Sequence, residues 1–102
     1  MAFYTDTFME KHRDWLRKNI NKVEVMVGST WHTGTIQAKY TSTSGVYVSA
    51  VFDDLTDAAC TITSLRVLDL DGEVVAQQSE NITKAAGQGV LICLSLPITE
   101  EE

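Results

Sequence analysis

The acids of the stretch DLDGEVVAQQSE, residues 69–80, have the clearest potential for chemistry in this chain. The stretch begins at Asp69 and ends at Glu80, the length of a helix-loop-helix calcium loop. Such a loop needs oxygen ligands at its first, third, fifth and twelfth positions and a glycine at its sixth. Acids occupy those ligand positions here, but Gly72 stands at the fourth position, where it cannot supply the bend. Val74 then begins an apolar run that favours a strand, so we expect no metal site.

The same stretch is typical of a β-hairpin. Asp71-Gly72 lies between two apolar runs, which is a strong local signal for a two-residue turn. Both central residues of such a turn need positive φ, which Asp tolerates and Gly prefers. We therefore expect Asp69 and Asp71 to project from an exposed turn, toward solvent or a basic partner. Asp53 and Asp54, in a polar loop earlier in the chain, are expected to do the same.

The other candidates for catalysis or metal binding are two histidines and two cysteines. His12 falls in a charged helical segment, and His32 follows Trp31 at the start of a strand. Neither has the Cys–His or Asp–His spacing of a metal site or a catalytic triad. Cys60 and Cys93 lie in apolar runs, which predicts two buried free thiols; a disulfide would need facing positions on adjacent strands. The sequence has no phosphate-binding, nucleophile-elbow or dinucleotide motif, so we expect no enzyme and no cofactor.

Length and composition predict one globular domain with a single core. The chain has 102 residues, 44% of them hydrophobic and 22% charged, with only 1 proline. Its net charge of −6 argues against binding to nucleic acid or to an anionic membrane. No apolar run is long enough to cross a bilayer, and the first residues lack the features of a signal peptide. We therefore expect synthesis in the cytoplasm without secretion by a signal peptide.

Residues 5–20 have the pattern of an amphipathic helix. Thr7 and Glu10 could form a capping box at its start, or Thr5 or Asp6 could cap it instead. Apolar residues recur at helical spacing and form one stripe, namely Tyr4, Phe8, Trp15, Leu16 and Ile20. Such a stripe favours packing against a sheet or a neighbouring subunit over binding of a cofactor. All of its members except the tyrosine are candidates for an interface.

After residue 21 the apolar period changes from the helical value to alternation, which predicts strands. The expected strands cover residues 22–28, 34–42, 45–53, 60–70, 73–79 and 89–98. The last is apolar on both faces near its start, which favours a central place in a sheet. Residues 42–45 should form a hairpin turn and residues 53–57 a connection between sheets.

These elements predict a mostly β fold with an N-terminal α-helix, of the α+β class. The β part should be a small antiparallel β-sandwich or an open barrel of about six strands. Residues 1–21 would form a helical arm, residues 22–98 the β-sandwich domain and residues 99–102 an acidic tail, all within one domain.

The segment ITSLRVLDLDGEVVAQQSENITKAAGQGVLICLSLPI, residues 62–98, combines an apolar strand, an Asp-x-Asp-Gly turn and a second apolar strand. A polar stretch with Asn81-Ile82-Thr83 and a final Gly-Val-Leu strand follow. This pattern resembles small structural proteins encoded among the tail, baseplate or fibre genes of bacteriophages and prophages. It covers about a third of the chain, and no collagen-like, coiled-coil or peptidase element accompanies it. The resemblance implies a non-enzymatic, oligomeric component of a virion or tail-like particle, which contacts copies of itself and other particle proteins.

Two further functions stay open. Trp15, Trp31, Tyr40 and Tyr47 could form a platform for carbohydrate, although scattered aromatic residues of small β domains more often serve the core or an interface. A sugar-binding module should expose Trp31, Tyr40 or Tyr47 on one concave face. A cytosolic adaptor domain should instead be a stable monomer with a single apolar patch.

Overall fold

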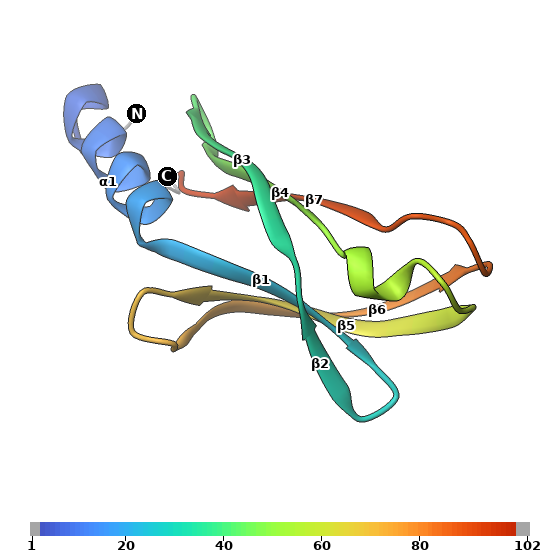
Figure 1. Cartoon of the computed structure of the whole chain (residues 1–102). Coiled ribbons are helices and arrows are strands. Elements are labelled where there is room, and N and C mark those ends of the chain that lie inside the picture. The colour runs from blue at the N-terminus through green and yellow to red at the C-terminus, as the bar shows by residue number, and fades with distance from the viewer. Residues whose placement is uncertain (1–2, 100–102) are drawn as a thin grey trace.

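The computed structural model describes residues 3–99, in which one helix precedes strands that form two antiparallel sheets (Figure 1). The strand order is β2-β1-β5-β6 in the first sheet and β3-β4-β7 in the second. The elements are α1 (Asp6–Asn19), β1 (Ile20–Val27), β2 (Thr30–Thr33), β3 (Thr35–Ser42), β4 (Gly45–Val51), the 3-10 turn η1 (Asp53–Leu55), β5 (Cys60–Asp69), β6 (Val74–Lys84) and β7 (Leu91–Pro97). The predicted fold class is confirmed. Residues 100–102 of the predicted acidic tail lie outside the described residues.

The hydrophobic core fills the space between the two sheets. Val23 and Val25 of β1 and Val46 and Val48 of β4 are each at most 1% exposed, and alternate residues of these strands point inward together. Phe52, at the end of β4, is the largest of the fully buried side chains. Burial of each such side chain stabilises the fold by about 1.5–3 kcal/mol relative to leaving it exposed.

The sheets are joined along one side by a corner at Gly34. Thr33 ends β2 in the first sheet, and the chain continues after Gly34 as β3 of the second sheet (Figure 1). The Gly34 N–H donates to the Val23 carbonyl at 2.9 Å. A Cβ at Gly34 would lie 2.7 Å from the Phe52 ring, so the corner needs glycine for the buried ring to approach. On the opposite side the outer strands β6 and β7 do not pair, and the sandwich is open.

Three strand predictions need correction. β2 was not predicted, because its four residues TWHT are too few to show alternation. β6 continues past residue 79 to Lys84, since Ile82 and Thr83 pair with β5. The central position predicted for the last strand is wrong: β7 is an edge strand and β4 occupies the centre. The apolar outer residues of β7 are not covered by another layer, and Leu91 is 60% exposed.

The hairpin at Asp71-Gly72 is confirmed, but its predicted turn type is wrong. Gly72 has a φ of 81°, whereas Asp71, like every other non-glycine residue among residues 3–99, has a negative φ. The Gly72 N–H donates to the Asp69 carbonyl at 3.1 Å, and the Asp69 N–H donates to the Glu73 carbonyl at 2.9 Å. These bonds define a three-residue loop in which only the last residue needs the left-handed conformation.

The two cysteines are free thiols, as predicted, but neither is fully buried. Cys60 of β5 is partly exposed and Cys93 of β7 is exposed. They belong to different sheets. Cys93 lies on the outer side of β7, whereas Cys60 is the first residue of β5 and shares the side of the buried Ile62. Apolar neighbours in the sequence therefore did not indicate burial at these two positions.

Candidate interaction surface

The N-terminal helix begins and ends with defined local interactions. Among the possible caps, Thr5 is the one used: its Oγ1 accepts a hydrogen bond from the Phe8 N–H at 3.2 Å. Asp6 lies in the first turn, with Arg17 and Lys18 in the last, so the charges complement the helix dipole. The helix passes directly into β1 at Ile20.

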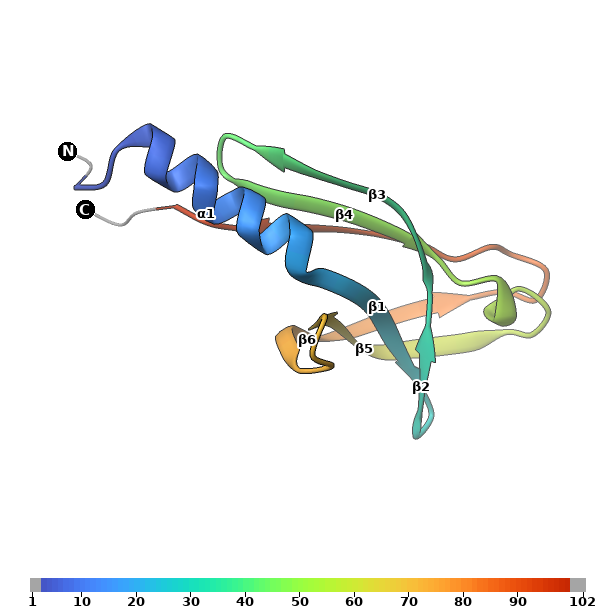
Figure 2. The same ribbon diagram turned by 60° about the vertical axis from the view of Figure 1, so that its left-hand side comes forward.

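The helix is attached to the sandwich along a narrow line. Figure 2 shows α1 continuing the direction of β1 and lying beside the β3–β4 hairpin. Leu16 packs against the core, and Ile20 is a core residue that is 1% exposed. The Arg13 Nε donates to the Ile98 carbonyl at 3.3 Å. None of the helical residues is buried, so α1 is an arm with two accessible sides.

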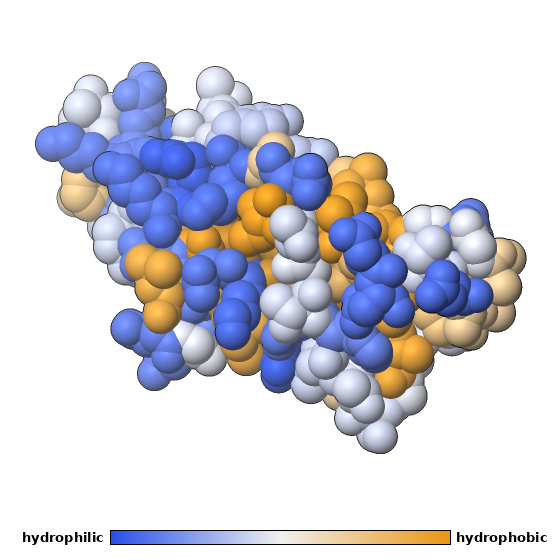
Figure 3. Space-filling view, viewed as in Figure 1, coloured by the Kyte–Doolittle hydropathy of each residue, from blue (hydrophilic) through white to orange (hydrophobic). Residues whose placement is uncertain are grey.

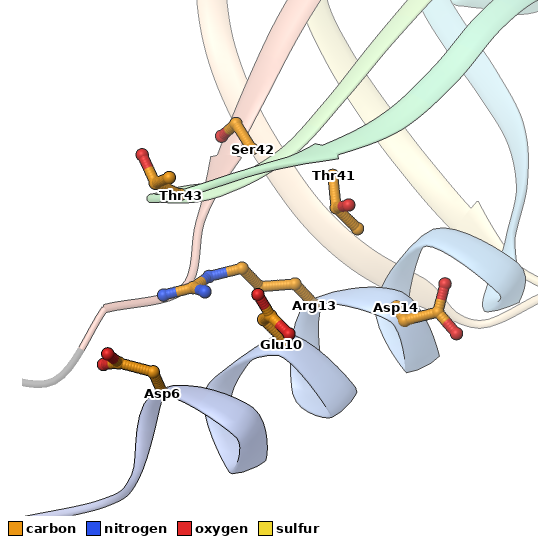
Figure 4. A pocket seen from close by; sticks show the side chains of 7 residues that line it. All are labelled: Asp6, Glu10, Arg13, Asp14, Thr41, Ser42 and Thr43. Carbon is orange, nitrogen blue, oxygen red and sulfur yellow. The ribbon is translucent and has the colours of Figure 1, made fainter.

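One accessible side of α1 forms a polar cleft with the β3–β4 hairpin. The cleft has a volume of about 720 Å³. It is lined by Asp6, Glu10, Arg13, Asp14, Thr41, Ser42 and Thr43 (Figure 4). Glu10 and Arg13 extend from the helix toward the hairpin, and Thr41 points back toward the helix. Asp6, Glu10 and Asp14 share one helix face because they are spaced four residues apart.

The charges of this cleft are partly neutralised within the helix. Asp14 Oδ1 accepts from Arg17 at 2.8 Å, and its Oδ2 lies 2.9 Å from the Lys18 ammonium. The hydrogen bond from Lys18, and then that from Arg17, lower the pKa of Asp14 below its usual value. On the face seen in Figure 3, the surface around the helix is mostly hydrophilic, whereas hydrophobic surface gathers in the middle of the molecule.

The other accessible side of α1 is aromatic. Phe8 is 42% exposed and Trp15 is 63% exposed. Together with Lys11 and His12 they line a shallow hollow of about 360 Å³, and we call these four residues the aromatic face. The Phe8 ring meets the His12 ring edge-on, with 5.0 Å between centroids. The predicted interface candidates thus divide: Phe8 and Trp15 are accessible, whereas Leu16 and Ile20 serve the core.

The predicted loop acids do not form one surface. Asp53 and Asp54 lie in η1, and Asp69 and Asp71 in the β5–β6 turn at the other end of the molecule (Figure 1). The Asp69 carboxylate forms hydrogen bonds within its own turn, because its Oδ1 accepts from the N–H groups of Asp71 at 2.9 Å and Glu73 at 3.0 Å. The acids at these two ends cannot contact one ligand together.

Two polar contacts between distant residues were not predicted. Asp54 Oδ2 lies 2.7 Å from His32 Nδ1, which ties η1 to β2. On the outer face of the first sheet, Glu24 accepts from Arg66 at 2.7 and 2.8 Å and from the Thr33 hydroxyl at 2.6 Å. No local motif signals these contacts. The partners of Glu24 are brought to it by β1–β2 and β1–β5 pairing, and His32 and Asp54 are 22 residues apart in the chain.

The Glu24 cluster has the properties of a structural element. Glu24 is 8% exposed. Burial raises the pKa of Glu24, but the hydrogen bonds from Thr33 and Arg66 outweigh it, and the pKa lies below its usual value. The Arg66 guanidinium also lies 3.9 Å from the centre of the Trp31 ring. Both carboxylate oxygens of Glu24 therefore accept hydrogen bonds from within the fold, one from Arg66 and the other from Thr33.

The aromatic residues expected of a sugar platform lie on opposite sides of the sandwich. Tyr40 and Tyr47 stack across β3 and β4 with 4.7 Å between ring centroids, and Tyr40 is 52% exposed. A hydrogen bond with Cys93 raises the pKa of Tyr47. Trp31 belongs to the other sheet, where the Arg66 guanidinium covers its ring. The three rings therefore do not form one concave face.

Among residues 3–99, no group of histidine, cysteine and acidic side chains could hold a metal ion. Within the same residues, no helix is long and apolar enough to span a membrane. Comparison of the chain with protein-family models, with curated proteins and with solved structures found no match.

Proposed function

We propose that this chain is a non-enzymatic structural or assembly subunit of a phage or prophage tail-like particle, acting through contacts with copies of itself and with other particle proteins. One observation carries the proposal: α1 is an arm without a buried residue, and it presents Phe8 and Trp15 at 42% and 63% exposure. The resemblance of residues 62–98 to phage tail-region proteins directs the proposal toward such a particle.

The aromatic face supplies the attraction that a subunit contact needs. Aromatic residues are enriched at the centres of protein interfaces, where they bury large areas. Burial of one such ring on a neighbour contributes about 1.5–3 kcal/mol. Lys11 and His12 border the two rings and place polar groups at the edge of the contact. The aromatic face therefore combines an apolar centre with a polar rim.

The polar cleft supplies orientation. Glu10 and Asp6 lie on the side of α1 opposite the aromatic face, beside the hydroxyl groups of Thr41 and Thr43. A basic side chain from a neighbouring subunit would find carboxylate acceptors there. Charge pairs of this kind contribute more to the rate and specificity of association than to affinity. In this proposal the chain is made in the cytoplasm and is incorporated into the particle afterwards.

The solution mass tests the subunit contact. We expect light scattering after size exclusion to show a defined oligomer for the parent chain and a smaller species for a Phe8→Glu/Trp15→Glu variant. Leu70→Glu is the matched control, because Leu70 is 62% exposed in the β5–β6 turn and does not line the aromatic face. Circular dichroism must show that each variant keeps its fold. A parent chain that is monomeric, or a helix variant that keeps its mass, contradicts the contact.

A second experiment tests the particle itself. An antibody raised against the purified chain should decorate tail-like particles in immunogold electron microscopy of material from the organism that carries the gene. We expect labelling at one defined position along the particle, because a structural subunit occupies equivalent sites. Preimmune serum is the control. Particles that carry no label, with the chain recovered only from the soluble fraction, would reject the particle and favour an adaptor domain.

A carbohydrate-binding module is the second candidate, favoured by the exposed Tyr40–Tyr47 stack alone. Stacked aromatic rings at a surface offer flat apolar area to a sugar ring. A glycan array would test this candidate. Binding that is lost in Tyr40→Ala and kept in Trp31→Ala would establish it, and an array without signal would reject it.

A further inference from the structure

The free edge of β7 lacks the usual protection against pairing with another strand. Natural edge strands are kept short, interrupted by bulges or marked by charges. Among the described strands, the edge β2 has four residues, and the edge β3 carries a bulge near Ile36 and the charge of Lys39. β7 is seven residues long and uncharged, and its pairing with β4 has no register shift. Only Pro97, at its end, limits the exposed edge.

The hydrogen-bonding groups at this edge follow from the bonds beside it. The Phe52 N–H donates to the Val90 carbonyl at 3.1 Å just before β7, and the Ile98 N–H donates to the Ser44 carbonyl at 2.9 Å just after it. Bonding alternates along an antiparallel pair. The even-numbered residues of β7 therefore bond to β4. The N–H and C=O groups that face the open edge are those of Leu91, Cys93 and Ser95.

These groups are self-complementary. In an antiparallel pair of two β7 strands centred on Cys93, that residue faces its own copy and Leu91 faces Ser95. Every N–H and C=O group at the edge then gains a partner. A shift toward the end of the strand places Pro97 opposite Leu91 and loses a bond, since proline has no N–H.

The side chains of β7 also suit a second copy. Leu94 and Leu96 are only partly buried, and with Leu65, Val67 and Ala76 they line a groove between the two sheets. Ile92 and Leu94 of a second β7 would extend the apolar layer beside this groove. A chain of net charge −6 repels its own copies, so self-association is favoured at surfaces without charged side chains. β7 has no charged side chain, so it cannot form an ion pair with a charged peptide.

We propose that β7 pairs antiparallel with β7 of a second copy, centred on Cys93, so that the β3-β4-β7 sheets of two subunits become one continuous sheet. The inference rests on the proposed function in taking the chain to be a self-assembling subunit. It uses none of the aromatic face, so each contact can fail without the other.

Two measurements on the full chain test this pairing. In a Cys60→Ser variant, Cys93 is the remaining thiol, and mild oxidation or a short bismaleimide should give a covalent dimer. A Cys93→Ser variant, which keeps Cys60, should give none. Ser95→Pro removes an edge N–H without touching the bonds to β4, whereas Ser95→Ala keeps that N–H.

We expect Ser95→Pro to weaken dimerisation by about tenfold to a hundredfold. The substitution removes one hydrogen bond of about 1 kcal/mol from each copy, and the two-fold symmetry of the pair makes two such losses. Ser95→Ala should dimerise as the parent does. The inference is overturned by a monomeric parent, or by an oligomer whose Cys93 thiols do not cross-link. An oligomer lost in the Phe8→Glu/Trp15→Glu variant but unchanged in Ser95→Pro would retain the proposed function and reject the β7 pairing.

Discussion

Replacement of Glu24 by glutamine should lower the free energy of unfolding by about 2–3 kcal/mol, because hydrogen bonds to a charged group contribute about 1.5–3 kcal/mol each. The Glu24 carboxylate accepts from Arg66 at 2.7 and 2.8 Å and from Thr33 at 2.6 Å. Glutamine keeps one carbonyl acceptor and loses the charge. The Arg66 side chain is 23% exposed, so water replaces part of the lost contact. For a domain of this size the change corresponds to about 10–20 °C in Tm.

The effect should depend on pH with a defined sign. The pKa of Glu24 in the folded chain lies below the usual value of 4.5. Its stabilising contribution is therefore complete above pH 4.5 and is lost as the pH falls through the folded pKa. The difference in unfolding free energy between the parent and Glu24→Gln should be largest near neutral pH and should shrink in acid.

Urea unfolding followed by tryptophan fluorescence would measure this difference. A Trp15→Phe background leaves Trp31, whose ring is covered by Arg66, as the reporter of the cluster. Asp14→Asn is the control, because its ion pairs with Arg17 and Lys18 are exposed and should contribute far less. A Glu24→Gln variant within about 0.5 kcal/mol of the parent, as for an ordinary surface substitution, would refute the reasoning. A difference that persists unchanged in acid would also refute it.

Three further substitutions test how the sandwich is held together, each measured by chemical unfolding. Gly45→Ala should be strongly destabilising, by about 1–3 kcal/mol or more, since its Cβ would lie 2.1 Å from the Leu96 carbonyl oxygen; parent-like stability would contradict this β4–β7 contact. Asp69→Ala should cost about 1 kcal/mol through the N–H groups it leaves unpaired in the β5–β6 turn, whereas Asp69→Asn should restore most of the loss. Lys84→Met should speed amide hydrogen exchange in the loop before β5, because the buried Lys84 ammonium donates to the Ala58 carbonyl at 2.5 Å. Unchanged exchange in this loop would show that the Lys84 hydrogen bond does not stabilise it.

Local pattern was sufficient for most of the secondary structure. The helix was predicted to within one residue at each end, since its apolar spacing and capping residues act over a single turn. Alternation located the strands that have one buried face, such as β4, because side chains of a strand point to opposite sides in turn. The same rule had too few residues to work with in β2, where only Trp31 and His32 separate the threonines.

Position within a sheet was beyond local pattern. β7 is apolar on both faces and was assigned to the centre, yet Leu91 and Cys93 are exposed at an edge. Alternation shows which residues of a strand share a face, but it does not show whether another strand or sheet covers that face. The division of the predicted interface stripe has the same origin, since helical spacing alone cannot tell Leu16, which contacts the core, from Trp15, which does not.

The sequence by itself determined the α+β fold class, a capped N-terminal helix, the β-hairpin at Asp71-Gly72 and the lack of a calcium-loop pattern, because these depend on residues within a few positions of each other. Only the tertiary structure decided that Glu24 meets Arg66, that Asp54 meets His32, and that β6 and β7 border an open side. Those contacts depend on which strands pair and in which register, a choice set by the combined burial of both sheets.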